Sequence, residues 1–240
     1  MSLIGKIYRQ LEPLIEVFFR TTRQSKTAAD PSKWKEQAQK GEFAFHKNDT
    51  WRQTEGFLQQ TSVLFKAWGF EADEFAGKTV LDVGAGSMLR GKYFKNAKLV
   101  ALEPMADDVL REIPWTDLRD AWKVFSTPAE QSIPELVGQV DFIFSINVLD
   151  HCYNFDEIIA NLYTYLKPGA RAFLSFDEHY VTNKMHPLIL TETICPPIFE
   201  KAGFKIEKFN KGFEGKAAEV MKVSTYGHGQ TCLNYWLRKP

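Results

Sequence analysis

The sequence predicts an α/β fold in which a mostly parallel sheet follows a helical amino-terminal segment. From Lys78 onward, short apolar runs alternate with stretches of helical spacing, which is typical of parallel strands joined by crossover helices. The first of these runs, 79–83, leads into a glycine-rich turn that opens a helix. The 240 residues can hold one large α/β domain, or a core with a helical extension.

The residues before the sheet form an expected helical cap or lid, 1–76, ahead of a core at 77–240. Apolar side chains recur at helical spacing over 3–24, with arginines between them, and Pro13 is expected to kink this helix. Such a basic amphipathic helix can pack on its own domain, pair two copies of the chain or lie on a membrane. We expect packing or a homodimer through this helix, and no membrane contact.

Two further signals lie in the cap. The run Asp30-Pro31-Ser32 contains an N-cap residue followed by proline, which predicts the start of a helix. A second helix is expected over about 50–68, where apolar residues again follow helical spacing.

Seven apolar segments are the strand candidates of the sheet. They are 79–83, 98–102, 122–126, 141–146, 170–176, 204–209 and 231–238. The first five are apolar enough to be buried on both faces. Lys167-Pro168-Gly169 predicts a turn just before the fifth. No helical pattern separates the last two, so we expect them to form a hairpin-like pair with one antiparallel strand.

Charge and cysteine content exclude several classes of protein. Thirty basic and thirty acidic side chains cancel, which gives no electrostatic reason to expect a nucleic-acid partner. The three cysteines, Cys152, Cys195 and Cys232, have no zinc-site spacing, and their sparse, odd number fits a reducing compartment. Neither a long apolar run nor a signal-peptide pattern is present. We therefore expect a soluble, cytoplasmic protein.

The turn after the first strand indicates a nucleoside site. Gly84 and Gly86 allow close approach of a ligand to the backbone, because glycine has no Cβ. Glu103 follows the next strand, seventeen residues after Gly86, where a carboxylate can accept both hydroxyls of a ribose. A nicotinamide dinucleotide is the alternative ligand. Its G-x-G-x-x-G pattern requires a third glycine where this chain has Leu89.

Five motifs in a fixed order resemble the class I S-adenosylmethionine-dependent methyltransferases of the small-molecule type, over about residues 50–238. They are Leu81–Gly86, Ala101–Pro104, Pro128–Glu130 before Ile133-Pro134, Asp141–His151 and Leu166–Gly169. The resemblance implies a seven-stranded Rossmann-like sheet whose last strand is antiparallel, which agrees with the strand pattern. It also implies S-adenosyl-L-methionine as the cofactor. The third glycine of the family's G-x-G-x-G pattern is Met88 here.

The resemblance and the lid expected below, which includes Arg52, together give a set of cofactor-binding residues. They are Arg52, Asp82, Gly84, Ala85, Gly86, Glu103, Pro104, Ala129, Glu130 and Asn147. Asp82 is expected to reach the cofactor's ammonium through water, or else to cap its own turn. Glu103 is expected to hold the ribose hydroxyls, or else to be a solvated loop charge. Ala129 and Glu130 would hold the adenine, unless Glu130 is a surface charge.

The segment Phe43-Ala44-Phe45-His46, together with Trp51-Arg52, is expected to form a lid over the cofactor. Arg52 could pair with the carboxylate of the cofactor as a bidentate partner, or form an ion pair at the surface.

Methyl transfer from a sulfonium is an in-line displacement, in which an enzyme aligns the acceptor and removes its proton. Histidine suits the proton step because its pKa lies near neutrality. His151 follows the fourth strand and His179 the fifth, at the edge where open α/β sheets bind ligands, and both are the expected catalytic residues. Asp177, His179 and His186 could instead bind a divalent cation, but their spacing is not diagnostic and we predict no metal.

The segment after the fourth strand narrows the choice of acceptor. Asn147–His151 is not the Asn/Asp-Pro-Pro-Tyr/Phe motif of enzymes that methylate planar amines, and the glutamate pair of protein arginine methyltransferases is absent. We expect O-methylation of a small molecule, such as a hydroxyl of a sugar or of a natural-product intermediate. A small amine, such as a phosphoethanolamine-type head group, is the alternative acceptor. A non-catalytic cofactor-binding partner subunit is the alternative of a different class.

Overall fold

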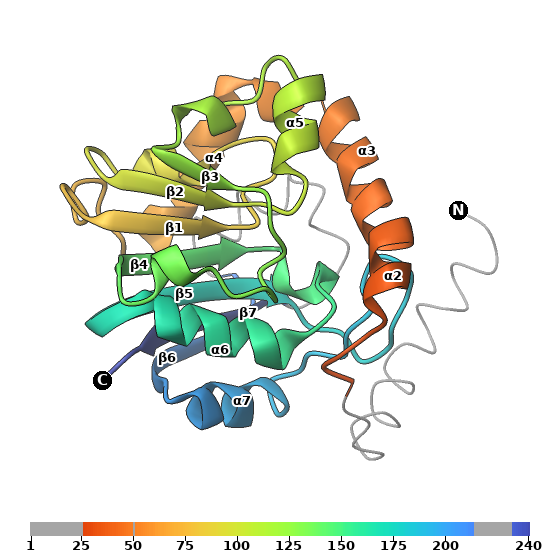
Figure 1. Cartoon of the computed structure of the whole chain (residues 1–240). Helices are drawn as coiled ribbons and strands as arrows, with labels where there is room; N and C mark the ends of the chain where they lie inside the picture. Colours follow the sequence, from red (N-terminus) through yellow and green to blue (C-terminus); the bar gives the residue numbers. More distant parts are fainter. Residues whose placement is uncertain (1–25, 50, 214–231) are drawn as a thin grey trace.

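The computed structural model describes residues 26–49, 51–213 and 232–240 (Figure 1). The helix expected over 3–24, with its kink at Pro13 and its homodimer contact, lies outside the described residues.

The core is a seven-stranded sheet in the order β3-β2-β1-β4-β5-β7-β6. The strands are β1 Thr79–Val83, β2 Lys98–Leu102, β3 Lys123–Phe125, β4 Val140–Ile146, β5 Leu166–Asp177, β6 Lys205–Lys211 and β7 Cys232–Arg238. Neighbours from β3 to β5 are parallel, whereas β7 is antiparallel to both β5 and β6. The predicted seven-stranded Rossmann-like sheet with an antiparallel last strand is confirmed.

One local expectation differs from the structure. The turn expected at Lys167–Gly169 is instead an irregular segment inside β5, which already begins at Leu166. Leu166 pairs with Val140, but Arg171 pairs with Phe142, so the extra residues form a bulge. Gly169 adopts a left-handed backbone there, with φ of 77°, and its N–H donates to the carbonyl of Lys239. The proline and glycine therefore bend the strand without interrupting it.

The strands present apolar side chains to both faces because successive residues point in opposite directions. Leu81 and Val83 of β1 belong to the core cluster on one face, which helices α6 Phe155–Tyr165 and α7 Cys195–Ala202 cover (Figure 1). Val80 belongs to the cluster on the other face, under α4 Glu55–Ala67. A further helix, α5 Ala106–Glu112, packs beside the end of β2.

The face under α4 is largely aromatic. Phe65 of α4 is fully buried and its ring contacts five other aromatic rings, those of Trp68, Phe70, Tyr93, Phe94 and Phe144. The last of these lies on β4, so α4 is attached to the middle of the sheet. Edge-to-face ring pairs of this kind add to the free energy gained from burial.

The amino-terminal described residues form one long helical path across the carboxyl edge of the sheet (Figure 1). It consists of α2 Pro31–Trp34, the π-helical turn η1 Lys35–Gln39 and α3 Lys40–Asn48. The N-cap expected at Asp30 is present, since its side chain accepts hydrogen bonds from the N–H groups of Ser32 and Lys33.

The helix expected over 50–68 begins later than the sequence suggested. Trp51–Gln53 form a separate 3-10 turn, η2, and α4 starts at Glu55. Other 3-10 turns are η3 Arg90–Tyr93, η4 Leu118–Asp120, η5 Pro134–Leu136 and η6 Leu149–His151. Within the part of the chain that the structure describes, no helix has the length and apolar character needed to cross a membrane.

Replacing the central aromatic side chain under α4 should destabilise the fold strongly. Phe65→Ala leaves a cavity among five rings, and we expect the free energy of unfolding to fall by about 3–5 kcal/mol. Urea denaturation measures the change. Val137→Ala, at a side chain 49% exposed, is the control and should change stability by less than about 0.5 kcal/mol. A loss below about 1 kcal/mol for Phe65→Ala would contradict the central packing role.

Candidate functional site

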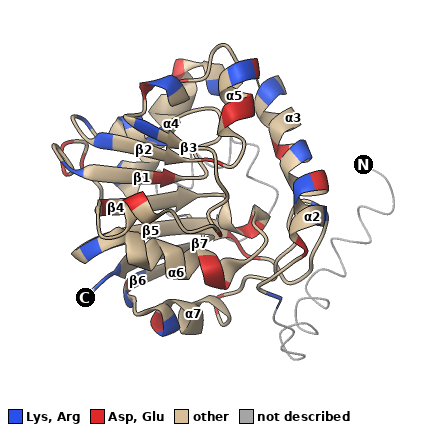
Figure 2. Cartoon of the chain, in the orientation of Figure 1, with Lys and Arg blue, Asp and Glu red and all other residues tan. Residues whose placement is uncertain are grey.

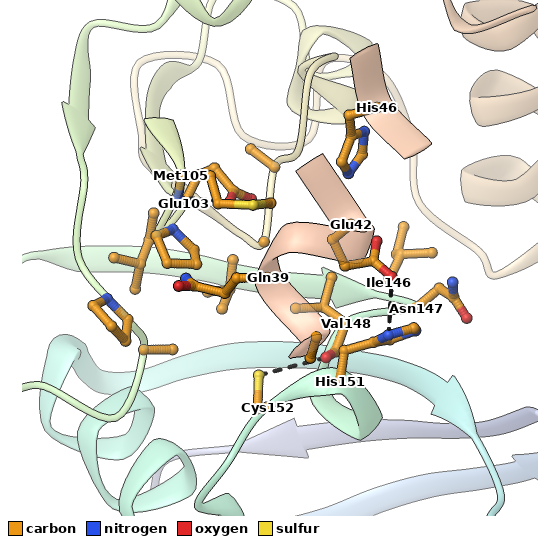
Figure 3. Close-up of a pocket in the computed structure, with 18 of the residues that line it drawn as sticks. Gln39, Glu42, His46, Glu103, Met105, Ile146, Asn147, Val148, His151 and Cys152 are labelled. Carbon is orange, nitrogen blue, oxygen red and sulfur yellow. Dashed lines mark hydrogen bonds and ion pairs between the residues drawn. The ribbon is translucent and has the colours of Figure 1, made fainter. Parts of the chain in front are cut away.

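A cavity of about 480 Å³ lies at the carboxyl ends of β1, β2 and β4, beneath α3 (Figure 3). Its floor consists of the residues that follow these strands, and its roof consists of side chains from α2 to α3. The order β2-β1-β4 places the cavity where the chain switches from one half of the sheet to the other. Open α/β sheets bind ligands at this point, because the loops after adjacent strands diverge there.

The glycine turn after β1 requires glycine for close packing. Gly84 and Gly86 have φ of 74° and 62°, a backbone region that is unfavourable for other residues. A Cβ at Gly84 would overlap the Val148 side chain, and one at Gly86 would overlap the ring of His46. The two glycines therefore allow Val148 of the loop after β4 and His46 of α3 to pack directly against the turn.

Glu103 joins the ends of β1 and β2. Its Oε2 accepts a hydrogen bond of 2.9 Å from the Gly86 N–H, and its Oε1 accepts one of 3.0 Å from the Met105 N–H. Burial raises the pKa of this carboxyl, and the two N–H donors oppose the rise. The side chain lines the cavity, and its oxygens have further lone pairs for ribose hydroxyls.

Asp82 occupies a different environment. Its Oδ2 accepts a hydrogen bond of 3.2 Å from the Gly91 N–H at the start of η3, and it is not among the cavity-lining residues of the described chain. Burial raises the pKa of Asp82 to about 7, against the lowering effects of that hydrogen bond and of Arg90. This is the turn-capping role that the sequence left open. Contact with a cofactor ammonium stays a prediction.

Arg52 lies in the cavity wall and not at the surface. Its Nε is 3.1 Å from Asp49 Oδ2, and its guanidinium lies over the rings of Phe45 and Phe57, at 5.3 and 5.1 Å from their centroids. Because the side chain is buried, the surface ion pair that the sequence offered as an alternative is wrong. The planar group is thereby held in a fixed orientation beside the cavity.

Glu130 is also buried, so the alternative of a surface charge is wrong. Its Oε1 accepts hydrogen bonds from the N–H groups of Tyr153 and Asn154, at 2.7 and 3.2 Å. Its Oε2 has no hydrogen-bond partner among the described residues. Burial raises the pKa of this carboxyl. A buried acceptor atom without a partner in a cavity wall is suited to a ligand donor such as an amine.

A cluster of histidines surrounds Asp150 after β4 and β5. Asp150 Oδ2 lies 3.1 Å from His179 Nε2, 2.8 Å from His186 Nδ1 and 3.5 Å from His151 Nε2. The other ring nitrogen of His151, Nδ1, lies 3.1 Å from Glu42 Oε1 on α3 (Figure 3). The structure therefore brings the two expected catalytic histidines to one carboxylate and connects that carboxylate to the lid.

The charges in this cluster shift one another's pKa values. Burial raises the pKa of Asp150, but the surrounding imidazoles outweigh burial and hold it well below its usual range. Burial lowers the pKa of His151, but the negative charges of Asp150 and Glu42 outweigh burial and raise this pKa to about 9. Asp177, which lines the cavity nearby, has its pKa raised to about 6 by burial and then by Asp150. At neutral pH His151 is therefore a cation between two carboxylates.

The underside of the lid contacts the glycine turn through His46. Its Nδ1 lies 3.1 Å from Ser87 Oγ, and the ring covers Gly86. Burial, together with the positive charge of Arg52, lowers the pKa of His46 to about 3, so the ring is neutral. Phe43–His46 lie on α3 and Arg52 on η2, and Phe45, His46 and Arg52 line the cavity, while the role of these residues as a lid over a cofactor stays a prediction.

Most of the residues predicted for the site meet at this cavity. Those that line it are Arg52, Gly84, Ala85, Glu103, Pro104, Ala129, Glu130, Asn147 and His151. Asp82, Gly86 and His179 are not lining residues of the described chain. Gly86 instead donates its N–H to Glu103, and His179 forms a hydrogen bond with Asp150, so both residues position carboxylates at the edge of the cavity.

Sequence reasoning did not select Glu42, His46 or Asp150 as site residues, and it considered His186 only in a cation site. Asp150 could have been found, since it stands directly before His151 at the end of the same strand. Glu42 could not, because no local signal relates it to a histidine more than a hundred residues away.

Comparisons with known proteins agree with this geometry. Residues 27–188 match the family model described as "Methyltransferase domain", and the chain belongs to that family. The predicted class I S-adenosylmethionine-dependent methyltransferase is thereby confirmed as the class of this protein.

One curated relative is a ubiquinone biosynthesis O-methyltransferase of Pseudomonas paraeruginosa. The two chains are 28% identical over 124 residues, which are 49% of this chain and 52% of the relative. The match therefore spans about half the length of that protein.

Two solved structures have a similar fold. The first is 1,6-didemethyltoxoflavin-N1-methyltransferase of Burkholderia thailandensis with bound 1,6-didemethyltoxoflavin and S-adenosylhomocysteine. Its TM-score is 0.58, with 16% identity, and the match covers 88% of this chain and 91% of that one. The second is phosphoethanolamine N-methyltransferase 2 of Haemonchus contortus in complex with S-adenosyl-L-methionine. Its TM-score is 0.52, with 14% identity, and the match covers 83% of this chain and 60% of that one.

The neutral, buried His46 should make stability depend on pH. Its folded pKa of about 3 lies below the unfolded value of about 6.5, so the unfolded chain binds the proton first as pH falls. Wild-type stability should therefore drop below pH 6.5, and the contribution of this side chain should be about 2 kcal/mol smaller at pH 5 than at pH 8.

The measurement is the difference in unfolding free energy between wild type and His46→Asn at pH 8 and at pH 5, since asparagine cannot titrate. The advantage of the wild type should shrink toward pH 5. A difference that is the same at both pH values would show that His46 is not buried in its neutral form.

Proposed function

We propose that this protein binds S-adenosyl-L-methionine in the cavity and transfers its methyl group to a hydroxyl of a small-molecule acceptor. The observation that carries the proposal is Glu103. Its carboxylate is held by backbone N–H groups at the end of β2, in a cavity wall beside the glycine turn, in a chain of the methyltransferase family.

The cavity contains groups that fit each part of this cofactor. Glu103 would accept the ribose hydroxyls, and Glu130, whose Oε2 is buried without a partner among the described residues, would accept the exocyclic amine of adenine. The turn at Gly84 and Ala85, with Arg52 across the cavity, would receive the methionine end. When bound, the cofactor supplies an electrophilic methyl group on a positively charged sulfur.

The protein's own residues would position the acceptor and exclude water. Asn147, His151, Asp177 and His186 provide polar groups on the side of the cavity near β4 and β5. Trp34 of α2 and Phe45 of α3 provide apolar groups above them. Closure by this helix keeps solvent from the reacting atoms, and alignment of the acceptor lowers the barrier to an in-line displacement.

The distribution of charged side chains and the size of the cavity support a small molecule as the acceptor. In the view of Figure 2, basic side chains lie among acidic ones along α3 and α5. A phosphate backbone would find no continuous basic surface there. A cavity of about 480 Å³ is of the size that takes small ligands.

The relatives support two kinds of acceptor group, a hydroxyl and an amine. The Pseudomonas relative is named as an O-methyltransferase, which supports a hydroxyl acceptor. The structures from Burkholderia and Haemonchus are N-methyltransferases, so an amine is the second candidate. The polar cluster around Asp150, directly beside the cavity, favours an enzyme over a non-catalytic partner subunit.

Removing the charge of Glu103 should weaken cofactor binding. Glu103→Gln keeps the size of the side chain but replaces one acceptor oxygen with a donor, and we expect a 10- to 100-fold loss of affinity for S-adenosylhomocysteine. Isothermal titration calorimetry measures the affinity. Glu135→Gln, an exposed carboxylate on η5, is the matched control and should bind like wild type.

Equal affinity in Glu103→Gln and wild type would overturn the assignment of the ribose site. Mass spectrometry of reactions with a panel of phenolic, sugar and amine acceptors then distinguishes the candidates. Bound cofactor without any methylated product across the panel would support the non-catalytic alternative.

A further inference from the structure

The cluster around Asp150 brings two histidine rings to one oxygen of a buried carboxylate. Among the described residues, Asp150, His179 and His186 form a group whose possible ligand atoms all lie within 4.8 Å of one another. Asp150 is fully buried, and His179 is buried beside it. Two imidazole nitrogens and a carboxylate oxygen converge on one point at the edge of the cavity.

We propose that Asp150, His179 and His186 bind a divalent transition-metal cation. The site is separate from the cofactor residues described above. The cation alternative that the sequence offered used His179 and His186 with Asp177, and the geometry puts Asp150 in the place of Asp177.

The distances fit metal ligation. Zinc bonds to imidazole nitrogen and carboxylate oxygen are about 2.0–2.2 Å long, which puts neighbouring ligand atoms about 3 Å apart. Asp150 Oδ2 lies 3.1 Å from His179 Nε2 and 2.8 Å from His186 Nδ1. The ring centroids of the two histidines are 4.2 Å apart. The ligand atoms of the three side chains all lie within 4.8 Å of one another, so a shared ion would draw the two imidazole nitrogens closer together.

The second oxygen of Asp150 gives an independent reason. Oδ1 is buried and has no hydrogen-bond partner among the described residues, although Oδ2 of the same carboxylate has several imidazole neighbours. A buried carboxylate oxygen without a partner costs free energy, because it has lost its hydration without compensation. A cation between the three side chains would neutralise the carboxylate and offer Oδ1 a second bond.

The ligand types indicate which cation would bind. Two histidines and one carboxylate are the ligands of zinc and of other first-row transition metals, whereas magnesium and calcium prefer oxygen ligands alone. Three protein ligands leave coordination positions open, as in catalytic rather than structural sites.

The open side of the site would face the acceptor. His186 lines the cavity together with His151 and Asp177. A cation here could bind an acceptor hydroxyl and lower its pKa, which prepares the oxygen for methylation. This last role rests on the proposed function, while metal binding itself does not.

The experiment measures metal on the full chain. After treatment with a chelator, the protein is titrated with Zn²⁺ by calorimetry, and with Co²⁺ by visible absorption. We expect one equivalent of metal per chain and the visible absorption of cobalt with nitrogen and oxygen ligands. His186→Ala and the conservative Asp150→Asn should each weaken binding at least a hundredfold. Glu135→Gln, which changes an exposed carboxylate on η5, is the control and should leave binding unchanged.

Two results would overturn the proposal. One is less than 0.1 equivalent of bound metal in wild type at micromolar Zn²⁺ and Co²⁺, roughly the range in which such sites are filled. The other is equal binding in wild type, His186→Ala and Asp150→Asn, which would place the metal elsewhere. S-adenosylhomocysteine affinity, measured on the same samples, separates this proposal from the proposed function. Retained cofactor binding without metal contradicts the metal site alone, and bound metal without cofactor binding contradicts only the proposed function.

Discussion

The site depends on one buried carboxylate. Glu103 accepts a hydrogen bond from Gly86 through one oxygen and from Met105 through the other, so it fixes the end of β2 to the turn after β1. Without it, two backbone N–H groups in the cavity wall would lose their acceptor, which is costly in a buried region. The position of the turn also determines where His46 and Val148 can pack, because both lie directly against its glycines.

The lid is attached to this framework through two polar contacts. His46 lies against Ser87 at the glycine turn, and Glu42 pairs with His151 beyond the end of β4. Figure 3 shows the second contact, and it shows His46 one helical turn beyond Glu42 on the same helix. Burial lowers the pKa of His46, so the first contact is made by a neutral imidazole, whereas Asp150 and Glu42 raise the pKa of His151, so the second is made by a charged one. The same helix is therefore held by two histidines with very different pKa values.

Local sequence patterns predicted most of the sheet, because a buried parallel strand is a short apolar run with distinctive turns at its ends. The bounds 79–83 and 98–102 agree with β1 and β2 as observed. The predicted beginning of β5 was wrong. Pro168 and Gly169 are usual in turns, but here they form an irregular segment inside the strand, between the pairs that Leu166 and Arg171 make with β4. Glu103 was recognisable as a site residue because the carboxyl ends of neighbouring parallel strands necessarily meet at one edge.

The sequence by itself determined the class of fold and the family, and it indicated the edge of the sheet where the candidate cavity lies, since each is encoded in short segments whose order along the chain is fixed. Only the tertiary structure decided which groups meet around Asp150 and His151. Glu42, Asp150 and His186 come from three segments whose proximity depends on how α3 and the loop after β5 fold over the sheet. Burial of Asp150 was equally invisible, because the environment of a charge is a property of the packed molecule and not of its neighbours in sequence.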